Sequence, residues 1–212
     1  MSAALGDYGV SVLSDALDRL GIAGQVEGVH AIGPTTTLCG PAFTIRMAPV
    51  EEKPRSVGDY IDDVPPGSVV VIDNAGRTDT TVWGGLLTFT ANTRGIAGTV
   101  IHGVCRDSEE LQTVPYALFA RDAHMRTGKD RVQAEEYNVP VSVGTARVAP
   151  GDWVVGDRDG VVVIPAAAVD RVLDAAKQIE AAEESIRAAV AAGKRLDEAR
   201  REFGYHALQT KV

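Results

Sequence analysis

The chain has 212 residues and a net charge of −8, with 45% hydrophobic and 24% charged residues. A chain of this length and composition is typical of a soluble protein with one well-buried core. The sequence has no basic stripe and no run of about 18 apolar residues, so we expect neither nucleic acid nor a membrane as a partner.

The first half of the chain alternates helical and strand patterns. Residues 10–20 carry apolar side chains at helical spacing and are followed by Gly21, which predicts a helix. Residues 40–47 alternate as a strand does, and residues 56–63 predict a short helix. Residues 68–73 are mostly β-branched, which is typical of a strand buried on both faces.

Residues 81–94 predict a helix that ends at Gly95, with Trp83, Leu86, Leu87 and Thr90 on one side. Residues 98–102 predict a second buried strand. A strand, a glycine-containing break, a helix and a strand form a βαβ unit, so we expect the strands at 68–73 and 98–102 to be parallel.

The second half predicts a short helix at 108–111, a strand at 116–120 and further strands at 139–143, 153–155 and 161–164, with a tight turn at 157–160. Residues 121–138 are polar and loop-like. This segment is longer than most connections, and long loops often carry function.

Residues 166–192 predict a long helix rich in alanine and glutamate, and residues 196–203 predict a short last helix. We expect a domain at 1–165 and a C-terminal helical arm at 166–212. Two arrangements of the arm are open: it lies across its own sheet, or it packs on a neighbouring subunit.

Cys39 and Cys105 are the two cysteines. The first seven residues lack the basic start and apolar run of a secretory signal. We therefore expect reduced thiols and a cytoplasmic protein.

Two short motifs are candidates for a ligand site. Gly84-Gly85 begins the predicted helix, where glycines admit a ligand to the backbone and free N–H groups bind carboxylates or phosphates. Arg106-Asp107 follows the strand at 98–102; arginine offers a planar fork to a carboxylate, and aspartate is a hard ligand for Mg²⁺ or Mn²⁺. The alternatives are an empty loop and a surface ion pair.

Both motifs follow the carboxyl ends of neighbouring parallel strands, where α/β sheets collect ligands. We therefore expect them to converge on one site. His102 ends the same strand and is expected to be a hydrogen-bonded structural residue, while Cys105 is expected to be buried filler.

Ordered blocks of the sequence resemble the RraA-like family, which includes the class II 4-hydroxy-4-methyl-2-oxoglutarate and 4-carboxy-4-hydroxy-2-oxoadipate aldolases. The blocks cover most of the chain: SDALDRLG at 14–21, GPA at 40–42, WGGLL at 83–87, GIAGTVIHGVCRD at 95–107, VPV at 139–141, PGD at 150–152 and GDRDGVVVIP at 156–165.

The resemblance implies an α/β fold of the swivelling β/β/α type, assembled as a homotrimer or homohexamer, with Mg²⁺ or Mn²⁺ as cofactor. It implies that Asp107 holds the metal, that Arg106 grips a pyruvate unit, and that backbone N–H groups of Gly84, Gly85, Leu86 and Leu87 bind its carboxylate. It also implies a catalytic glutamate from a neighbouring subunit's C-terminal helix, for which Glu183 is the better match and Glu184 the next.

Two positions depart from the aldolase pattern. Gly85 stands where the aldolases carry an acidic residue that assists proton transfer, and His102 stands where many members have aspartate. The sequence therefore names no obvious base for aldol cleavage, although His102, Asp73 and Asp79 lie nearby. Loss of CO₂ from oxaloacetate needs less base, which favours decarboxylation.

The expected function is thus a metal-dependent lyase that cleaves a 2-keto acid through a pyruvate enolate, as an aldolase or an oxaloacetate decarboxylase. Arg121, Arg126 and Lys129 are the cations available for the distal end of the substrate. The rival is a non-enzymatic regulator that binds a ribonuclease; in that branch of the family the aspartate after the arginine is missing, whereas Asp107 is present here.

Overall fold

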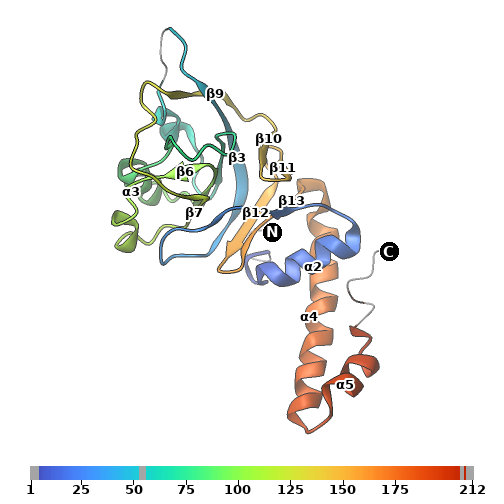
Figure 1. Cartoon of the computed structure of the whole chain (residues 1–212). Helices are drawn as coiled ribbons and strands as arrows, with labels where there is room; N and C mark the ends of the chain where they lie inside the picture. The colour runs from blue at the N-terminus through green and yellow to red at the C-terminus, as the bar shows by residue number, and fades with distance from the viewer. Residues whose placement is uncertain (1–4, 53–55, 206–207, 209–212) are drawn as a thin grey trace.

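A computed structural model describes residues 5–52, 56–205 and 208 as a mixed α/β fold with one large sheet. The strands of this sheet follow the order β1, β13, β12, β3, β4, β5, β7 and β2, and β9 pairs with β3 (Figure 1). The long strand β3 joins the two halves, because its first part pairs with β12 and its second part with β4 and β9. The strands run over Gln25–Val26 (β1), His30–Ala31 (β2), Leu38–Pro49 (β3), Val69–Asp73 (β4), Gly98–His102 (β5), Leu118–Ala120 (β7), Val132–Tyr137 (β9), Trp153–Asp157 (β12) and Gly160–Ile164 (β13).

The parallel core of the sheet is β3, β4, β5 and β7. The first four residues of β4 are at most 1% exposed, as their β-branched run predicts for a strand covered on both faces. The predicted βαβ unit is confirmed, since β4 and β5 are parallel with Val69 opposite Gly98. Two smaller sheets pair β10 (Val141–Val143) with β11 (Ala146–Val148) and β6 (Val104–Cys105) with β8 (Asp122–Ala123).

Three of the four α-helices lie close to the positions that the sequence predicts. They run over Val10–Leu20 (α2), Gly85–Thr93 (α3), Val169–Ala191 (α4) and Leu196–Glu202 (α5), with short 3-10 helices at Asp59–Asp63 (η1), Glu110–Gln112 (η2) and Ala166–Ala168 (η3). Gly21 ends α2 in the left-handed conformation with φ 65°, which a residue without Cβ adopts easily.

The predicted start of the helix at residue 81 is wrong, because α3 begins only at Gly85. The preceding residues instead run parallel to β6: Val82 N–H donates to Val104 O at 3.3 Å, and Arg106 N–H donates to Trp83 O at 2.9 Å. The expected apolar face is also wrong, since Leu86 is 85% exposed while Trp83 is buried ahead of the helix.

The expectation of a loop at 121–138 is wrong as well. Residues 132–137 form β9, which pairs antiparallel with β3. The sequence of β9 is too polar to show the alternation of a strand, and among its residues only Val132, Gln133 and Ala134 are buried.

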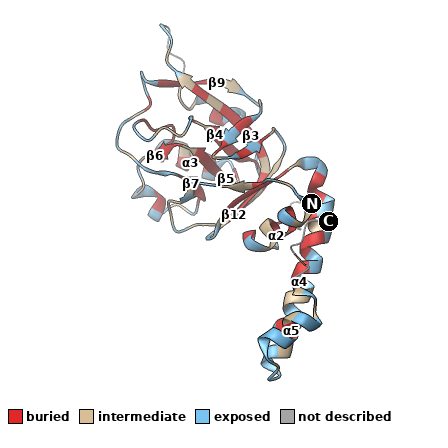
Figure 2. Cartoon of the chain, turned by 45° about the vertical axis from the view of Figure 1, so that its right-hand side comes forward, coloured by how far each residue is buried: buried red, intermediate tan, exposed pale blue. Residues whose placement is uncertain are grey.

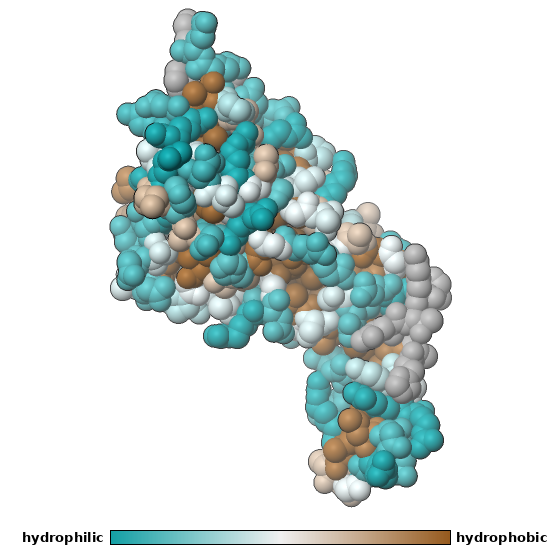
Figure 3. Space-filling model, in the orientation of Figure 1, coloured by the Kyte–Doolittle hydropathy of each residue, from teal (hydrophilic) through white to brown (hydrophobic). Residues whose placement is uncertain are grey.

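The C-terminal helix α4 packs on α2 and then extends away from the sheet, with α5 folded against it (Figure 1). Its buried side chains lie mostly in the half near α2, and Figure 2 shows its far end largely exposed. Figure 3 shows apolar atoms at the tip of this arm, where Val190 and Leu196 are 40% and 46% exposed. The division into a domain at 1–165 and an arm at 166–212 stays a prediction. No helix among the described residues is long and apolar enough to cross a membrane.

Candidate active site

The start of α3 forms the floor of the candidate site. Gly84 precedes the helix in an extended conformation, and Thr88 N–H donates to Gly84 O at 3.0 Å. The N–H groups of Leu86 and Leu87 lie in the first turn, ahead of the first intrahelical bond, and both residues line the pocket described below. Buried Trp83 fixes this turn through a 2.9 Å hydrogen bond from Nε1 to Thr88 Oγ1 and stacks on Tyr116.

Asp107 binds directly to this helix start. Gly85 N–H donates to Asp107 Oδ2 at 2.9 Å, and Arg106 Nε lies 3.3 Å from the same oxygen. Asp107 has φ 58°, a left-handed conformation that aspartate tolerates better than most residues. The side chains of Arg106 and Asp107 are 41% and 36% exposed, so a small molecule can reach both.

The two glycines leave room for the charged side chains. A Cβ on Gly84 would lie 2.7 Å from Asp107 Oδ2 and 3.0 Å from Arg106 Nε. A Cβ on Gly85 would lie 1.9 Å from Oε2 of Glu110. The sequence interpretation missed Glu110, which lies in the helix expected at 108–111, and the spacing of the residues gave no signal for its place beside Gly85.

These groups line one pocket of about 610 Å³, a size that suits a small metabolite. Its walls include Arg106, Asp107, Glu110, Leu87, Thr127 and Gly128. The last two belong to the polar segment at 121–138, which Thr81 holds by donating from its N–H to Arg126 O at 3.1 Å. The structure therefore brings together both sequence motifs and part of that segment.

Other candidate residues lie in different surroundings. His102 Nδ1 is 3.4 Å from Asp73 Oδ1, and Asp73 also accepts hydrogen bonds from Ala75 N–H and Ser142 N–H. These contacts fit the structural role expected for His102. Asp79 lies 3.8 Å from Arg126 at the surface.

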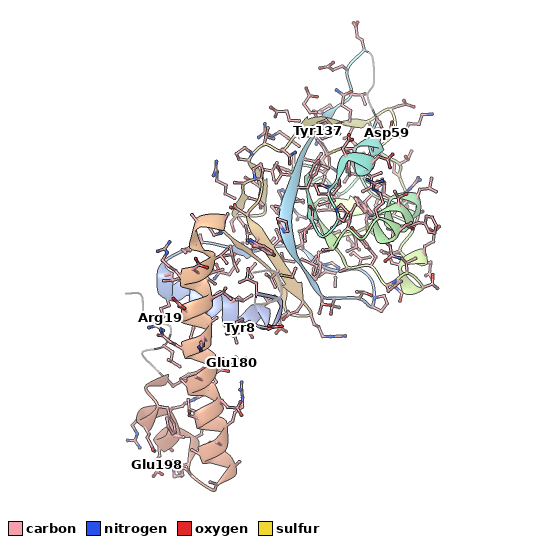
Figure 4. All side chains as sticks on the ribbon, turned by 180° about the vertical axis from the view of Figure 1, so that it is seen from behind. Tyr8, Arg19, Asp59, Tyr137, Glu180 and Glu198 are labelled. Atoms are coloured by element: carbon pink, nitrogen blue, oxygen red, sulfur yellow. The ribbon has the colours of Figure 1, made fainter. Side chains whose placement is uncertain are left out.

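Glu183 lies on α4, where Arg187 donates a 2.6 Å hydrogen bond to its carboxylate. In Figure 4, Glu180 of the same helix lies partway along the helical arm, whereas Asp59, which lines the pocket, lies on the far side of the large sheet from the arm. One chain thus does not bring Glu183 to its own pocket, whose lining does not include this residue.

Cys39 and Cys105 do not form a disulfide with each other, and Cys105 is fully buried. Burial, with smaller effects from Asp122 and Asp107, raises the pKa of Cys105 to about 12. A thiol held protonated in this way is a poor nucleophile, which agrees with its expected role as filler.

Asp107 is suited to a hard cation. Both of its side-chain contacts involve Oδ2, which leaves Oδ1 for a metal. In the described part of the chain, no three histidine, cysteine, aspartate or glutamate side chains converge as a metal site. A cation bound at Asp107 would therefore need water, substrate or a second subunit to complete its coordination.

Comparison with known proteins places this geometry in a family. The model of the RraA-like family, described as Aldolase/RraA, matches residues 10–163, and the chain belongs to this family. Its fold is the swivelling α/β type expected from the sequence, with a long C-terminal helix.

Particular relatives carry different names. The chain is 39% identical to "Protein DlpA" of Legionella pneumophila over 91% of its own length, but it spans only 32% of that protein. It is 32% identical to a Halalkalibacterium halodurans protein named "Putative 4-hydroxy-4-methyl-2-oxoglutarate aldolase", covering 82% of this chain and 80% of the relative.

Solved structures show the same fold. An uncharacterized protein from Pseudomonas syringae pv. tomato has a TM-score of 0.87 at 39% identity, covering 94% of this chain and 96% of that one. Streptomyces coelicolor RraAS2, described as an unusual member of the RNase ES inhibitor RraA protein family, has a TM-score of 0.81 at 27% identity, covering 88% of this chain and 96% of that one. Names within the family thus support a lyase at a general level and include ribonuclease inhibitors.

Proposed function

We propose that the protein is a divalent-metal-dependent lyase that cleaves a 2-keto acid to give a pyruvate enolate. One observation carries the proposal: Arg106 and Asp107 lie together over the N-terminus of α3, in a pocket sized for a small acid. An arginine fork, an acidic metal ligand and free helix N–H groups are what a chelating keto acid requires.

The substrate carboxylate would bind the first turn of α3. Gly85 N–H is engaged by Asp107, so the N–H groups of Leu86 and Leu87 remain as its donors. The helix dipole adds to their attraction for an anion. We therefore assign substrate binding to Leu86 and Leu87, with Gly84 and Gly85 providing close approach.

Arg106 would bind the keto oxygen and stabilise the negative charge that develops there as the enolate forms. Mg²⁺ or Mn²⁺ held by Asp107 would supply Lewis-acid stabilisation of the same charge. The distal end of the substrate would meet Thr127 and Gly128. The pocket lining does not include the expected cations Arg121, Arg126 and Lys129, and Arg121 lies instead beside Gly76 and His102.

The reaction would be aldol cleavage of 4-hydroxy-4-methyl-2-oxoglutarate, decarboxylation of oxaloacetate, or both, because each passes through the pyruvate enolate. A coupled pyruvate assay with each substrate, in Mg²⁺ or Mn²⁺ and in EDTA, tests the proposal. Metal-dependent pyruvate release is the expected result.

A homo-oligomer is part of the proposal. Three large apolar side chains near the pocket are exposed: Leu86 and Phe89 on α3, at 85% and 66%, and Met125, which is two residues before Thr127 in the chain, at 83%. Such exposure is typical of surfaces covered by another chain. A trimer or hexamer would cover them and bring Glu183 to a neighbouring site.

The same exposed side chains favour one second candidate, a regulator that binds a ribonuclease, as the names of related structures suggest. Asp107 distinguishes the two candidates, since a binding surface has no need of a metal ligand. Tight ribonuclease binding without pyruvate release would favour the regulator.

A further inference from the structure

Glu110 occupies the space in which a side chain at position 85 would lie. A Cβ built on Gly85 would be 1.9 Å from Oε2, 2.6 Å from Cδ and 2.9 Å from Oε1 of Glu110. These distances are far below van der Waals contact, so the carboxylate and a residue-85 side chain exclude each other. Gly85 is buried and Glu110 is exposed, and both residues line the pocket.

One backbone turn presents Glu110 and Asp107 to the same helix start. Glu110 N–H donates to Asp107 O at 3.0 Å, which closes the turn between the two residues. Asp107 reaches Gly85 N–H from one end of this turn, while the Glu110 carboxylate lies over the Gly85 Cα from the other. The left-handed φ of 58° at Asp107 helps to set this course.

The proposed chemistry needs a group that moves protons. In retro-aldol cleavage a base takes the proton of the C4 hydroxyl, the C3–C4 bond breaks into an enolate and a carbonyl product, and C3 of the enolate then receives a proton to give pyruvate. Arg106 is permanently charged and Asp107 is assigned to the metal. Three other carboxylates line the pocket, those of Glu110, Asp59 and Asp62. Asp59 and Asp62 belong to η1, whereas Glu110 lies against Gly85, the residue whose N–H Asp107 binds.

We infer that Glu110 is the acid–base residue of this site, taking the hydroxyl proton of the substrate and returning it to the enolate carbon. The inference rests on the proposed function. Gly85 stands where the aldolases that this chain resembles carry an acidic residue. In this chain the carboxylate of Glu110 occupies the space beside position 85 instead.

Exchange of the pyruvate methyl protons in D₂O tests this role, because it reports enolate formation and protonation without carbon–carbon cleavage. With pyruvate and Mg²⁺ or Mn²⁺ as probes, NMR should show exchange by the wild-type chain and a loss of about 100-fold or more in Glu110→Gln. Glu109→Gln is the matched control, because Glu109 is exposed like Glu110 but does not line the pocket, and it should exchange at the wild-type rate.

A second variant keeps the carboxylate but moves it. Gly85→Ala places a Cβ where Glu110 now lies, and the flexible glutamate can swing away, so exchange should fall although every charged residue remains. If Glu110→Gln and Gly85→Ala both keep wild-type exchange, Glu110 has no acid–base role. If the wild-type chain itself shows no exchange, the proposed function is overturned and this role with it.

Thermal unfolding tests the placement independently of any activity. Gly85→Ala should change Tm little in the wild-type chain, because moving the Glu110 carboxylate offsets the gain in helix propensity. In a Glu110→Ala background the same change should raise Tm, because the space is empty and alanine favours helix more than glycine. Equal shifts in the two backgrounds would show that the carboxylate does not lie over Gly85.

Discussion

Gly85 N–H donates a 2.9 Å hydrogen bond to Oδ2 of Asp107, a residue 22 positions later in the chain. This bond joins the start of α3 to the turn after β6 and sets the acidic residue at the positive end of a helix dipole. It also ties the fold to the proposed chemistry, because the residue that would hold the metal is the one that caps the helix.

Asp107→Asn should reduce metal-dependent pyruvate release by at least about 100-fold, since the amide retains an acceptor for Gly85 N–H but loses the charge that binds Mg²⁺ or Mn²⁺. Asp107→Ala should lose the same activity and, in addition, about 0.5–2 kcal/mol of the free energy of unfolding, as for removal of an N-terminal cap. Activity assays and urea unfolding check both. Full activity in Asp107→Asn would remove this residue from the site.

Gly84→Ala should impair the site without removing any functional group. The new Cβ would lie 2.7 Å from Asp107 Oδ2 and 3.0 Å from Arg106 Nε, so both side chains must move. We expect a loss of about 10-fold to 100-fold in kcat/KM, as small misplacements of catalytic groups produce. Gly9→Ala is the control, because its Cβ would have no neighbour nearer than 3.8 Å.

Arg106→Lys should raise KM for oxaloacetate and lower kcat, because an ammonium group cannot form the two parallel hydrogen bonds of a guanidinium. Steady-state kinetics measure both constants. Arg158→Lys, on the turn between β12 and β13, should leave them unchanged, and equal kinetics for the two variants would contradict the role of Arg106.

Mixing two inactive variants tests the shared site. The Asp107→Asn protein and the Glu183→Gln protein should each be inactive. When equal amounts of the two are unfolded together and refolded into mixed oligomers, roughly a quarter of the sites should recover activity. That fraction is expected if each site needs Asp107 from one copy and Glu183 from another. No recovery in a mixed oligomer would place Glu183 outside the site.

Tyr60 and Tyr116 offer a matched test of the core. Burial, and to a smaller extent Tyr116 and Tyr137, raises the pKa of Tyr60; burial raises that of Tyr116, partly offset by its 2.7 Å hydrogen bond with Thr99. A raised pKa in the folded state means that folding favours the protonated tyrosines. Their contribution to the free energy of unfolding is therefore fully present below about pH 10 and is lost as the pH rises above that value. Unfolding followed by circular dichroism between pH 9 and 12 should show the loss.

The two tyrosines should differ when the hydroxyl is removed. Within the described residues, Tyr60 OH is buried without a hydrogen-bond partner. Tyr60→Phe should therefore stabilise the protein by about 1 kcal/mol, whereas Tyr116→Phe should destabilise it by a similar amount through loss of its bond to Thr99. Opposite signs in urea unfolding are expected, and destabilisation by both changes would argue against an unpaired Tyr60 hydroxyl.

Much of the fold could be predicted from periodicity. The β-branched run of β4 and the apolar spacing of α2 and α4 depend on burial patterns that repeat along the chain, and the structure confirms them. The polar strand β9 could not be found in this way, because its pairing with β3 stabilises it although Gln133, Glu135 and Glu136 give it no apolar alternation.

The convergence of Arg106-Asp107 with the start of α3 could be predicted, because both follow the carboxyl ends of neighbouring parallel strands. Glu110 could not, because its place over Gly85 depends on a side-chain position and on a left-handed turn at Asp107, which spacing alone does not define. For the same reason the chain appeared to lack an acidic group where the structure supplies one.

The most direct test of the central claim is pyruvate release from 4-hydroxy-4-methyl-2-oxoglutarate and from oxaloacetate, followed with lactate dehydrogenase in Mg²⁺ or Mn²⁺ and in EDTA. Turnover of at least one substrate in metal, and its loss in EDTA, is the predicted result. Absence of turnover with both substrates, or turnover that EDTA leaves intact, would contradict a metal-dependent lyase site built on Arg106 and Asp107.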